Sequence, residues 1–287
     1  MRNYVIYTDS SCDLSSELLK SLGVLSESLT FRFTDESVEY KNSDMEISEF
    51  YDRMRRGKVA KTSAINSETF LTEFEKIVSD GEDILYLGFS SGLSTTYNSA
   101  RIASGELLAK YPEAKIILVD TLCASAGAGL LVKMAADKKE NGASIDETAE
   151  YIESIKMKVC HWFTVDDLVY LKRGGRVSAT TAFVGNMLGI KPVMHVDNEG
   201  HLVNVTKVRG RRAAITALAD KYGQTHIDGD YEVFISHSDC LEDAKTLAEI
   251  IETKYGKKTS LITNVGAVIG AHSGPGTLAL FFIGNER

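Results

Sequence analysis

Two hydroxyl residues, Thr62 and Ser63, follow Lys61 between two helix-like segments, and we expect them to lie in a loop. Hydroxyl groups in a loop can donate to an anion, and helix N-termini also favour negative charge. Taken alone, the pair is better explained by a helix cap or a hydroxyl-mediated turn. The two residues become candidates for an anion site only in combination with other segments.

A second polar segment runs from Gly88 to Tyr97, between a predicted strand and a predicted helix. Ser94 is expected to open that helix and to present its hydroxyl beside backbone N–H groups, with Ser91 and Thr95 in support. Simple capping by Ser94 is the structural alternative. If the hydroxyls act as donors, this segment also binds an anion.

The same segment allows a different chemistry. Gly88 to Gly92 matches the GxSxG pattern of a nucleophile elbow, with Ser90 as the nucleophile. Asp239 or another acid and His272 follow in the chain order of α/β-hydrolases. No HGGG-type oxyanion motif precedes the serine, and a five-residue match in Ser- and Gly-rich sequence is weak. An esterase-like serine hydrolase therefore stays the alternative function.

His272 is the one titratable residue in a segment rich in small residues, Val265 to Gly276. Glycines allow unusual backbone angles and close approach of a ligand, so we expect a glycine-rich loop with a functional histidine. Arg173 and Arg176 flank a Gly-Gly turn and could bind phosphate or carboxylate groups, although a turn with solvated arginines explains them equally simply.

Asp9 and Asp120 end two predicted strands, where each could cap the next helix or orient a site group. No HExxH, EF-hand or Cys/His cluster predicts a metal, and no GxGxxG or Walker A pattern predicts ATP binding. The four cysteines are widely spaced, as is typical of isolated reduced thiols. We therefore expect neither a metal nor a cofactor.

The elements that must position these groups alternate between short apolar runs and amphipathic stretches. Strands are predicted at 4–7, 29–33, 84–88 and 116–119, and helices follow around 18–19, 70–78, 95–110, 124–136 and 145–156. A repeated strand, polar turn and helix is typical of a parallel α/β sheet, which places its binding loops at the carboxyl ends of the strands.

The pattern changes beyond residue 157. A β-hairpin is predicted from 191–196 and 201–208, turning at Asn198-Glu199-Gly200, followed by a helix from Arg211. Further strands are predicted at 233–236, 260–263 and 277–283, with a helix around 244–251. We therefore predict two α/β domains, an N-terminal one over 1–157 and a C-terminal one over 158–287.

Composition limits the classes of function. The 287 residues are 44% hydrophobic, enough for a substantial core, and their net charge of −8 argues against a general role in nucleic-acid binding. No apolar run approaches 18 residues, and no signal peptide opens the chain. We expect a cytoplasmic protein without stable membrane insertion.

Six segments, in this order, make the whole chain resemble the DegV family of bacterial fatty-acid-binding proteins. They are Thr8-Asp9-Ser10, Thr62-Ser63, Ser90 to Tyr97, the segment that begins at Asp120, Arg173 to Arg176, and Gly270 to Gly276. Two departures flank the expected site. The family commonly has Gln-Pro after the Thr-Ser pair, where this chain has Ala64-Ile65, and Gly after the serine that corresponds to Ser94, where it has Thr95.

The resemblance implies a two-lobed α/β fold that buries a long-chain fatty acid such as palmitate between its lobes. Carried over by position, Thr62, Ser94 and His272 would contact the carboxylate. Arg173 and Arg176 would face a partner or a developing phosphate. Candidates for the apolar tunnel are Phe89, Leu93, Ile190, Met194 and Phe281.

The resemblance also implies a role. Members are similar to the acyl-carrying subunit of bacterial fatty acid kinase, in which a separate ATP-binding protein phosphorylates the carboxylate for phospholipid synthesis. The chain would then be a carrier without independent catalysis. Because the fold is shared with dihydroxyacetone kinase, a small-molecule kinase subunit is a third possibility, and ATP binding by the isolated protein would identify it.

Overall fold

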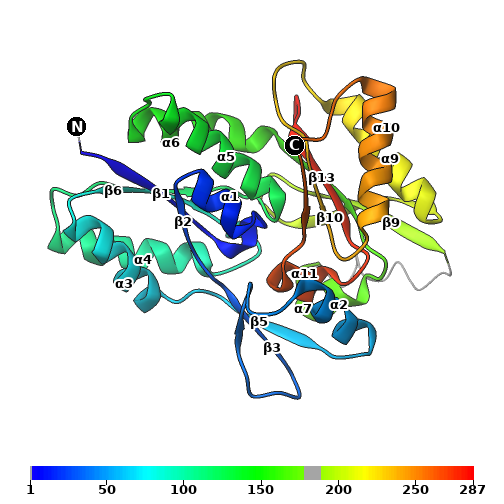
Figure 1. Cartoon of the computed structure of the whole chain (residues 1–287), viewed down its shortest axis with the longest axis horizontal. Helices are drawn as coiled ribbons and strands as arrows, with labels where there is room; N and C mark the ends of the chain where they lie inside the picture. Colours follow the sequence, from blue (N-terminus) through cyan, green and yellow to red (C-terminus); the bar gives the residue numbers. More distant parts are fainter. Residues whose placement is uncertain (1, 178–188) are drawn as a thin grey trace.

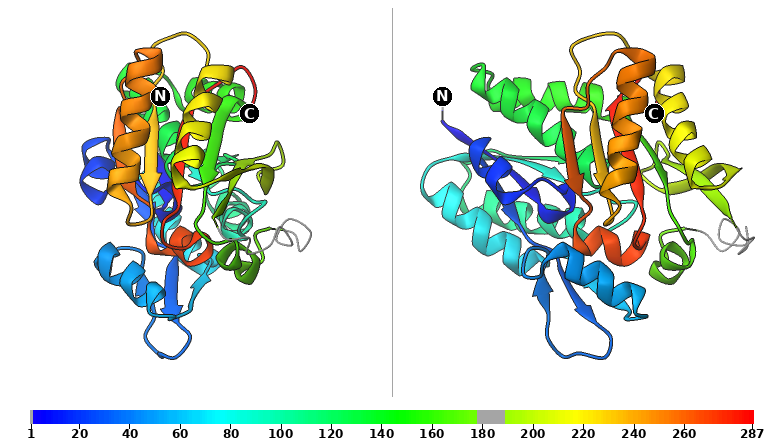
Figure 2. Two further views of the ribbon diagram at one scale, coloured as in Figure 1. Left: turned by 90° about the vertical axis from the view of Figure 1, so that its right-hand side faces the viewer. Right: turned by 45° about the vertical axis from the view of Figure 1, so that its right-hand side comes forward.

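The computed structural model describes residues 2–177 and 189–287 of the chain. Their strands form three sheets, which we call sheets A, B and C (Figure 1). Sheets A and C are the two larger sheets. Sheet B is a small antiparallel sheet that lies below them in the views of Figures 1 and 2. The mixed α/β class predicted from the sequence is confirmed.

Sheet A is parallel, with the strand order β2-β1-β6-β7. Its strands are β1 (Tyr4–Asp9), β2 (Val24–Glu27), β6 (Asp83–Gly88) and β7 (Ile116–Asp120). Every residue of β6 is buried, as expected for a central parallel strand covered on both faces. Its carboxyl end and that of β7 deliver the segments that follow Gly88 and Asp120 to one edge of the sheet.

Helices cover both faces of sheet A. Leu85 and Leu87 pack in one core with α5 (Ala126–Glu140) and α6 (Ile145–Ile155), whereas Ile84 and Tyr86 pack in another with α3 (Ser67–Ser79) and α4 (Thr96–Lys110). This alternation follows from the two-residue side-chain period of a strand. The short elements η1 (Ser10–Cys12) and α1 (Ser16–Ser21) lie between β1 and β2.

Sheet C is mixed, with the strand order β10-β9-β8-β13-β11-β12. Its strands are β8 (Val159–Thr164), β9 (Ile190–Val196), β10 (Leu202–Arg209), β11 (Phe234–His237), β12 (Leu261–Asn264) and β13 (Leu278–Ile283). Its outer face packs on α9 (Arg211–Thr225) and α10 (Leu241–Tyr255), while its inner face turns toward α5. The predicted hairpin is present as β9 and β10.

Sheet B has the order β4-β3-β5 and was not predicted as a separate sheet. Its strands are β3 (Thr30–Phe33), β4 (Tyr40–Lys41) and β5 (Ala60–Ser63), and it shares an aromatic core with α2 (Ile47–Arg55) and α11 (Ala267–Ser273). Thr62 therefore lies in a strand and not in the predicted loop. Antiparallel pairing with Phe31 supplies the hydrogen bonds that a loop would lack.

The predicted glycine-rich loop around His272 is also wrong, because Ala267–Ser273 forms the helix α11. Buried tertiary contacts of Val268 and Ala271 outweigh the low helix propensity of Gly270. The remaining elements are η2 (Lys156–Lys158) and α7 (Val169–Gly174). The chain passes from α6 into β8 through η2, next to the domain boundary predicted at residue 157, and that division stays a prediction.

Candidate functional site

A cavity of about 470 Å³ lies between the strand-end loops of sheet A, helix α11 and the inner face of sheet C. This volume is within the range of small-molecule sites. Eleven lining residues carry a hydroxyl, imidazole or guanidinium group, and six of them come from β5, the loop before α4, the end of α7 and helix α11, namely Thr62, Ser91, Ser94, Thr95, Arg176 and His272. We call these six residues the polar end of the cavity.

Thr62 and His272 meet at the polar end, although 210 residues separate them in the chain. The Thr62 hydroxyl and the His272 Nε2 atom are 2.8 Å apart and form a hydrogen bond. Strand β5 carries the threonine and helix α11 the histidine, and the two elements share one core. The bond fixes the rotation of both side chains, so that one polar surface is preformed.

The surroundings of His272 keep its imidazole neutral near pH 7. Burial, assisted by the positive charge of Arg176, lowers the pKa of His272 to about 4. The Nδ1 atom is buried and has no hydrogen-bond partner in the described part of the chain, and it faces the Cα atom of Gly174. An uncovered lone pair costs less than an unpaired N–H, which favours the tautomer whose Nε2–H donates to Thr62. The Thr62 hydroxyl proton is then available to an acceptor in the cavity.

Ser94 lies at the start of α4 but does not open the helix, because Thr95 is the N-cap and Thr96 the first helical residue. The Ser94 hydroxyl accepts from the Thr96 backbone N–H at 3.2 Å and lies 2.9 Å from the Thr96 hydroxyl. The N-terminal end of the 15-residue helix α4 carries a partial positive charge, so the Ser94 hydroxyl lies where an anion is favoured.

Two aspartates hold the loop that carries Ser94. Asp9 accepts from the Phe89 backbone N–H at 3.0 Å as well as from Ser11 in η1, and Asp120 accepts from the Ser91 N–H at 3.2 Å. Asp9 also caps the short helix η1 and so fills both roles weighed from the sequence, whereas Asp120 orients the loop but does not cap the next helix, α5, whose N-cap is Ser125. Neither aspartate lines the cavity.

Arg176 brings a positive charge to the cavity. Its Nε atom donates to the Leu93 carbonyl at 3.1 Å, and the side chain is only partly exposed. Burial lowers the pKa of Arg176, and no carboxylate pairs with it among the described residues. A partly buried cation without a counter-charge is costly, so the polar end favours an anionic ligand.

The rest of the lining is mostly apolar. Alternate residues of β8 and β13 face the cavity: Phe163 and His161 on one strand, Ala279 and Phe281 on the other. Leu93, Val196 and Leu202 add aliphatic surface from the loop and the hairpin. The cavity is thus a channel that combines one polar end with an apolar wall.

A buried polar cluster borders this wall at the junction of sheets A and C. The Ser125 hydroxyl donates to Asp13 at 2.5 Å and lies 2.9 Å from the Ser236 hydroxyl, while Asp13 also accepts from the Gly266 N–H at 2.9 Å. Burial raises the pKa of Asp13 to about 7. Ser125 has a φ of 53°, a conformation unusual for a residue other than glycine. Ser125 and Ser236 line the cavity themselves, and their hydroxyls form hydrogen bonds within the cluster.

A family model described as an uncharacterised protein of the DegV family matches residues 3–285. A DegV domain-containing protein of Clostridium perfringens is 45% identical, and the alignment covers 100% of this chain and 99% of that protein. The chain belongs to the DegV family. The resemblance drawn from the six sequence segments is thereby confirmed.

Solved DegV structures share the fold. A DegV lipid-binding protein from Thermotoga maritima is 32% identical, with a TM-score of 0.84 over 99% of both chains. A stearic-acid-binding protein from Eubacterium ventriosum is 25% identical, with a TM-score of 0.88 over 98% of both chains. These DegV relatives bind lipid or fatty acid, and both likenesses extend over nearly the whole molecule.

The predicted supporting, partner-facing and tunnel residues divide between the cavity lining and other places. Ser63 lies outside the lining and donates to Glu39 at 2.9 Å. Arg173 is exposed in the last turn of α7, with its guanidinium 5.6 Å from the centre of the Tyr170 ring. Of the tunnel candidates, Phe89, Leu93 and Phe281 line the cavity, whereas Ile190 and Met194 do not.

Ser90, His272 and Asp239 do not form the catalytic triad that the serine hydrolase alternative requires in this DegV chain. Ser90 is fully buried, lies outside the lining and donates its hydroxyl proton to the Gly200 carbonyl at 2.9 Å. His272 bonds to Thr62, and Asp239 forms an ion pair with Arg55 at 2.5 Å. The three groups of the suggested triad therefore have separate partners.

Sequence reasoning missed much of the channel. Strand β8, with His161 and Phe163, was not predicted, although its run of aromatic and branched residues is a strand signal. Ser125 and Ser236 gave no signal, because only the contact between sheets A and C brings them together. Of the three residues that depart from the family pattern, Ala64 and Thr95 line the cavity, whereas Ile65 does not.

Two further findings concern residues 2–177 and 189–287. None of their helices has the length and apolar character that a bilayer crossing requires. These residues also contain no group of three or more histidine, cysteine, aspartate or glutamate side chains suited to a metal ion.

Proposed function

We propose that this chain binds one long-chain fatty acid in the cavity, with the carboxylate held by the hydroxyls of Thr62 and Ser94, while His272 orients the Thr62 hydroxyl through their hydrogen bond. The observation that carries the proposal is a single cavity in which a preformed polar end continues into an apolar channel. Solved relatives that bind lipid or stearic acid support this ligand class.

The charges at the polar end suit a carboxylate. His272 is neutral near pH 7, so Arg176 supplies the positive charge, while Thr62 and Ser94 supply hydroxyl donors. A buried carboxylate without partners would be strongly disfavoured. Ser91 and Thr95 add hydroxyls beside the same helix N-terminus. A fatty alcohol or ester of equal length would leave Arg176 without a counter-charge.

The tail supplies most of the binding energy. Burying one methylene contributes about 0.8 kcal/mol, so a sixteen-carbon chain contributes on the order of 10 kcal/mol before the costs of binding. The apolar wall from β8, β13 and the hairpin suits such a tail. We propose palmitate as a representative ligand.

The first test is extraction and titration. Organic extraction of the purified protein followed by mass spectrometry should recover a fatty acid, and the delipidated protein should bind palmitate more tightly than hexadecanol.

Replacing Thr62 with Val should weaken palmitate binding about tenfold, the value of one hydrogen bond to a charged group. Thr246→Val, on the exposed side of α10, is the control and should bind as wild type. A protein that is empty as purified and does not bind added palmitate would contradict the proposal.

We further propose that the chain is a carrier for a separate ATP-dependent kinase, which converts the bound carboxylate to an acyl phosphate for phospholipid synthesis. Arg173 is exposed beside the polar end and suits a contact with that partner. The isolated chain should not bind ATP. Acyl phosphate should form only when the chain, palmitate, ATP and a partner kinase from the same cells are combined. ATP binding by the chain alone would favour a kinase subunit instead.

A further inference from the structure

We propose that Phe281 and His161 form the closed end of the channel and set the longest acyl chain that this protein accepts. The inference rests on the proposed function, because it concerns the tail of the same ligand. It assigns chain-length selection to one pair of side chains on adjacent strands of sheet C.

The direction of the channel follows from strand β13. Thr277, Ala279 and Phe281 all line the cavity, and Thr277 follows closely on helix α11, which carries His272. Alternate residues on one face of a strand lie about 7 Å apart, so this row extends about 14 Å away from the polar end. Strand β8 contributes Phe163 opposite Ala279 and His161 opposite Phe281.

The channel stops at this pair. The next residues on the same face are Ile283 of β13 and Val159 of β8, which pair with each other. Both are buried in the core with α5 and α6, and neither lines the cavity. The rings of His161 and Phe281 meet edge to face, with centroids 5.2 Å apart and an interplanar angle of 88°. They separate the channel from the solid core.

The His161 ring is fixed by hydrogen bonds and by close packing against helix α5. Both nitrogens of His161 are hydrogen-bonded, Nδ1 to the Val159 carbonyl at 2.9 Å and Nε2 to the Ala124 N–H at 3.3 Å. Gly127 of α5 packs so closely that a methyl group there would overlap the imidazole. The two rings therefore have little room to move away from a longer tail.

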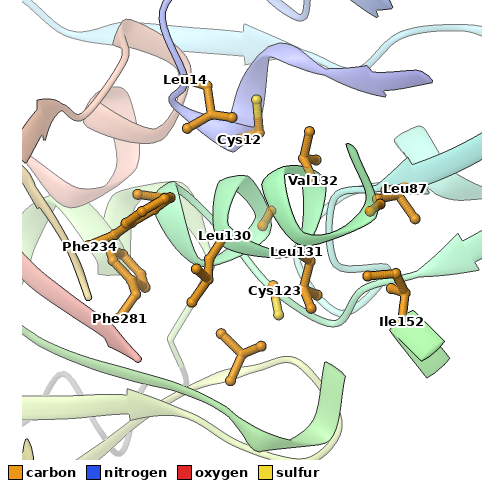
Figure 3. Packing of buried hydrophobic residues seen from close by; sticks show 14 of the residues in the cluster. Cys12, Leu14, Leu87, Cys123, Leu130, Leu131, Val132, Ile152, Phe234 and Phe281 are labelled. Carbon is orange, nitrogen blue, oxygen red and sulfur yellow. The ribbon is translucent and has the colours of Figure 1, made fainter. Parts of the chain in front are cut away.

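Phe281 is supported in the same way. It lies beside Phe234 and close to Leu130 of α5 (Figure 3), and it pairs with Phe234 across the sheet. Truncation of Phe281 would open space between the channel and these side chains. Phe282, its neighbour, is equally buried but points to the opposite face, where it packs on Tyr222. The chain thus offers a matched control on the same strand.

The affinity should follow chain length up to a limit. Each buried methylene strengthens binding by about fourfold, the equivalent of about 0.8 kcal/mol. Wild-type affinity should rise by this factor per carbon from twelve carbons until the tail reaches the pair, and then level off or fall. We call the chain length at which the rise stops the break point.

Saturated fatty acids of twelve to twenty-two carbons are titrated into delipidated wild type, F281A, F281L and F282L. F281A should move the break point to chains at least two carbons longer, and F281L should move it in the same direction by less. F282L should leave it unchanged. The milder F281L keeps the test open if F281A does not fold, and thermal unfolding of each variant reports its folded state.

The outcomes separate the two proposals. A wild type that binds fatty acids without any break point, or a break point that stays in place in both Phe281 variants, would overturn the role of the pair but leave fatty-acid binding intact. An equal movement in F282L would also overturn it, since loosened packing would then be the cause. A wild type that binds no fatty acid of any length would overturn the proposed function and this inference with it.

Discussion

At the scale of residues, the polar end depends on how tightly His272 is surrounded. Its Nε2 atom bonds to Thr62, and Gly174 leaves just enough space for the other side of the ring. Gly174 ends helix α7 and precedes Gly175, which has a φ of 70°. The Gly-Gly turn identified in the sequence is therefore part of the site, and its first glycine is required by packing and not by its backbone angle.

Replacing Gly174 with Ala should displace the His272 ring and break its bond to Thr62. We expect fatty-acid affinity to fall about tenfold, because one charge-assisted hydrogen bond at the carboxylate loses its geometry. Calorimetric titration with palmitate measures the effect. Gly105→Ala is the control, since a methyl group there meets open space in α4, and it should bind as wild type. Equal losses in both variants would show that His272 is not positioned by Gly174.

Buried titratable groups make opposite contributions to the pH dependence of stability. Burial lowers the pKa of His161 to about 3, so the unfolded chain takes up a proton first, and stability is lost as the pH falls from about 6.5. Burial raises the pKa of Asp13 to about 7, so its contribution is complete below about pH 3.8 and is lost as the pH rises toward 7. Between these limits the two effects oppose each other.

Replacing Asp13 with Asn should therefore remove one of the two opposing contributions, so that the contribution of His161 to the pH dependence of stability is no longer offset. The stability of D13N relative to wild type should rise with pH between 4.5 and 6.5, by at most about 1.4 kcal/mol per pH unit. Urea unfolding at three pH values measures this difference. The exposed Asp80→Asn variant should run parallel to wild type. A D13N curve that also runs parallel would contradict an Asp13 pKa near 7.

At the scale of elements, the hairpin β9–β10 covers the channel by docking on the loop after β6. Val196 and Leu202 line the cavity from the two strands, and the Gly200 carbonyl between them accepts from Ser90. Gly92 lies so close to the tip that an added Cβ atom would be 2.7 Å from the Glu199 carbonyl oxygen. The serine that resembled a nucleophile instead joins two elements.

Ser90→Ala should loosen the hairpin tip. It leaves the Gly200 carbonyl without its donor in a buried place, which costs about 1–3 kcal/mol. Amide hydrogen exchange should become faster around residues 197–202, and a fluorophosphonate probe should label neither protein. Ser154→Ala, which removes an exposed hydroxyl on α6, should leave exchange in the hairpin unchanged. If the probe labels wild type and Ser90→Ala abolishes the labelling, the serine hydrolase hypothesis would be supported instead.

At the scale of the whole molecule, the cavity lies where all three sheets come together. Thr62 comes from sheet B, the loop of Ser94 from sheet A, and Phe281 from sheet C. The Asp13–Ser125–Ser236 cluster joins sheets A and C beside it. A ligand that contacts all these walls should stabilise them as one unit.

Palmitate should accordingly raise the melting temperature of the whole chain in a single transition. At a free concentration one hundred times the dissociation constant, the added stability is about 2.7 kcal/mol, which corresponds to several degrees. Calorimetry with and without palmitate measures the shift, and hexadecanol at the same concentration should produce less. Separate transitions, of which only one responds to palmitate, would show that the walls of the cavity unfold independently.

The sequence determined the parts of this protein that depend on local pattern. Alternating apolar runs and polar turns predicted three of the four strands of sheet A (β1, β6 and β7), the hairpin and most long helices, because burial periodicity is local. The short strand β2 was missed. The six ordered segments indicated the family, which the family model confirms. Thr62, Ser94 and His272 were named as one group from that resemblance, since each residue alone is explained by an ordinary structural role.

Only the tertiary structure decided which elements carry Thr62 and His272 and how these residues contact one another. Thr62 became part of a strand and His272 part of a helix because packing in one core outweighed local propensity. The closed end at Phe281 and the role of Gly174 depend on contacts between residues about 100 or more positions apart. Such contacts leave no local pattern in the chain, because they arise only when separately folded layers meet and exclude water between them.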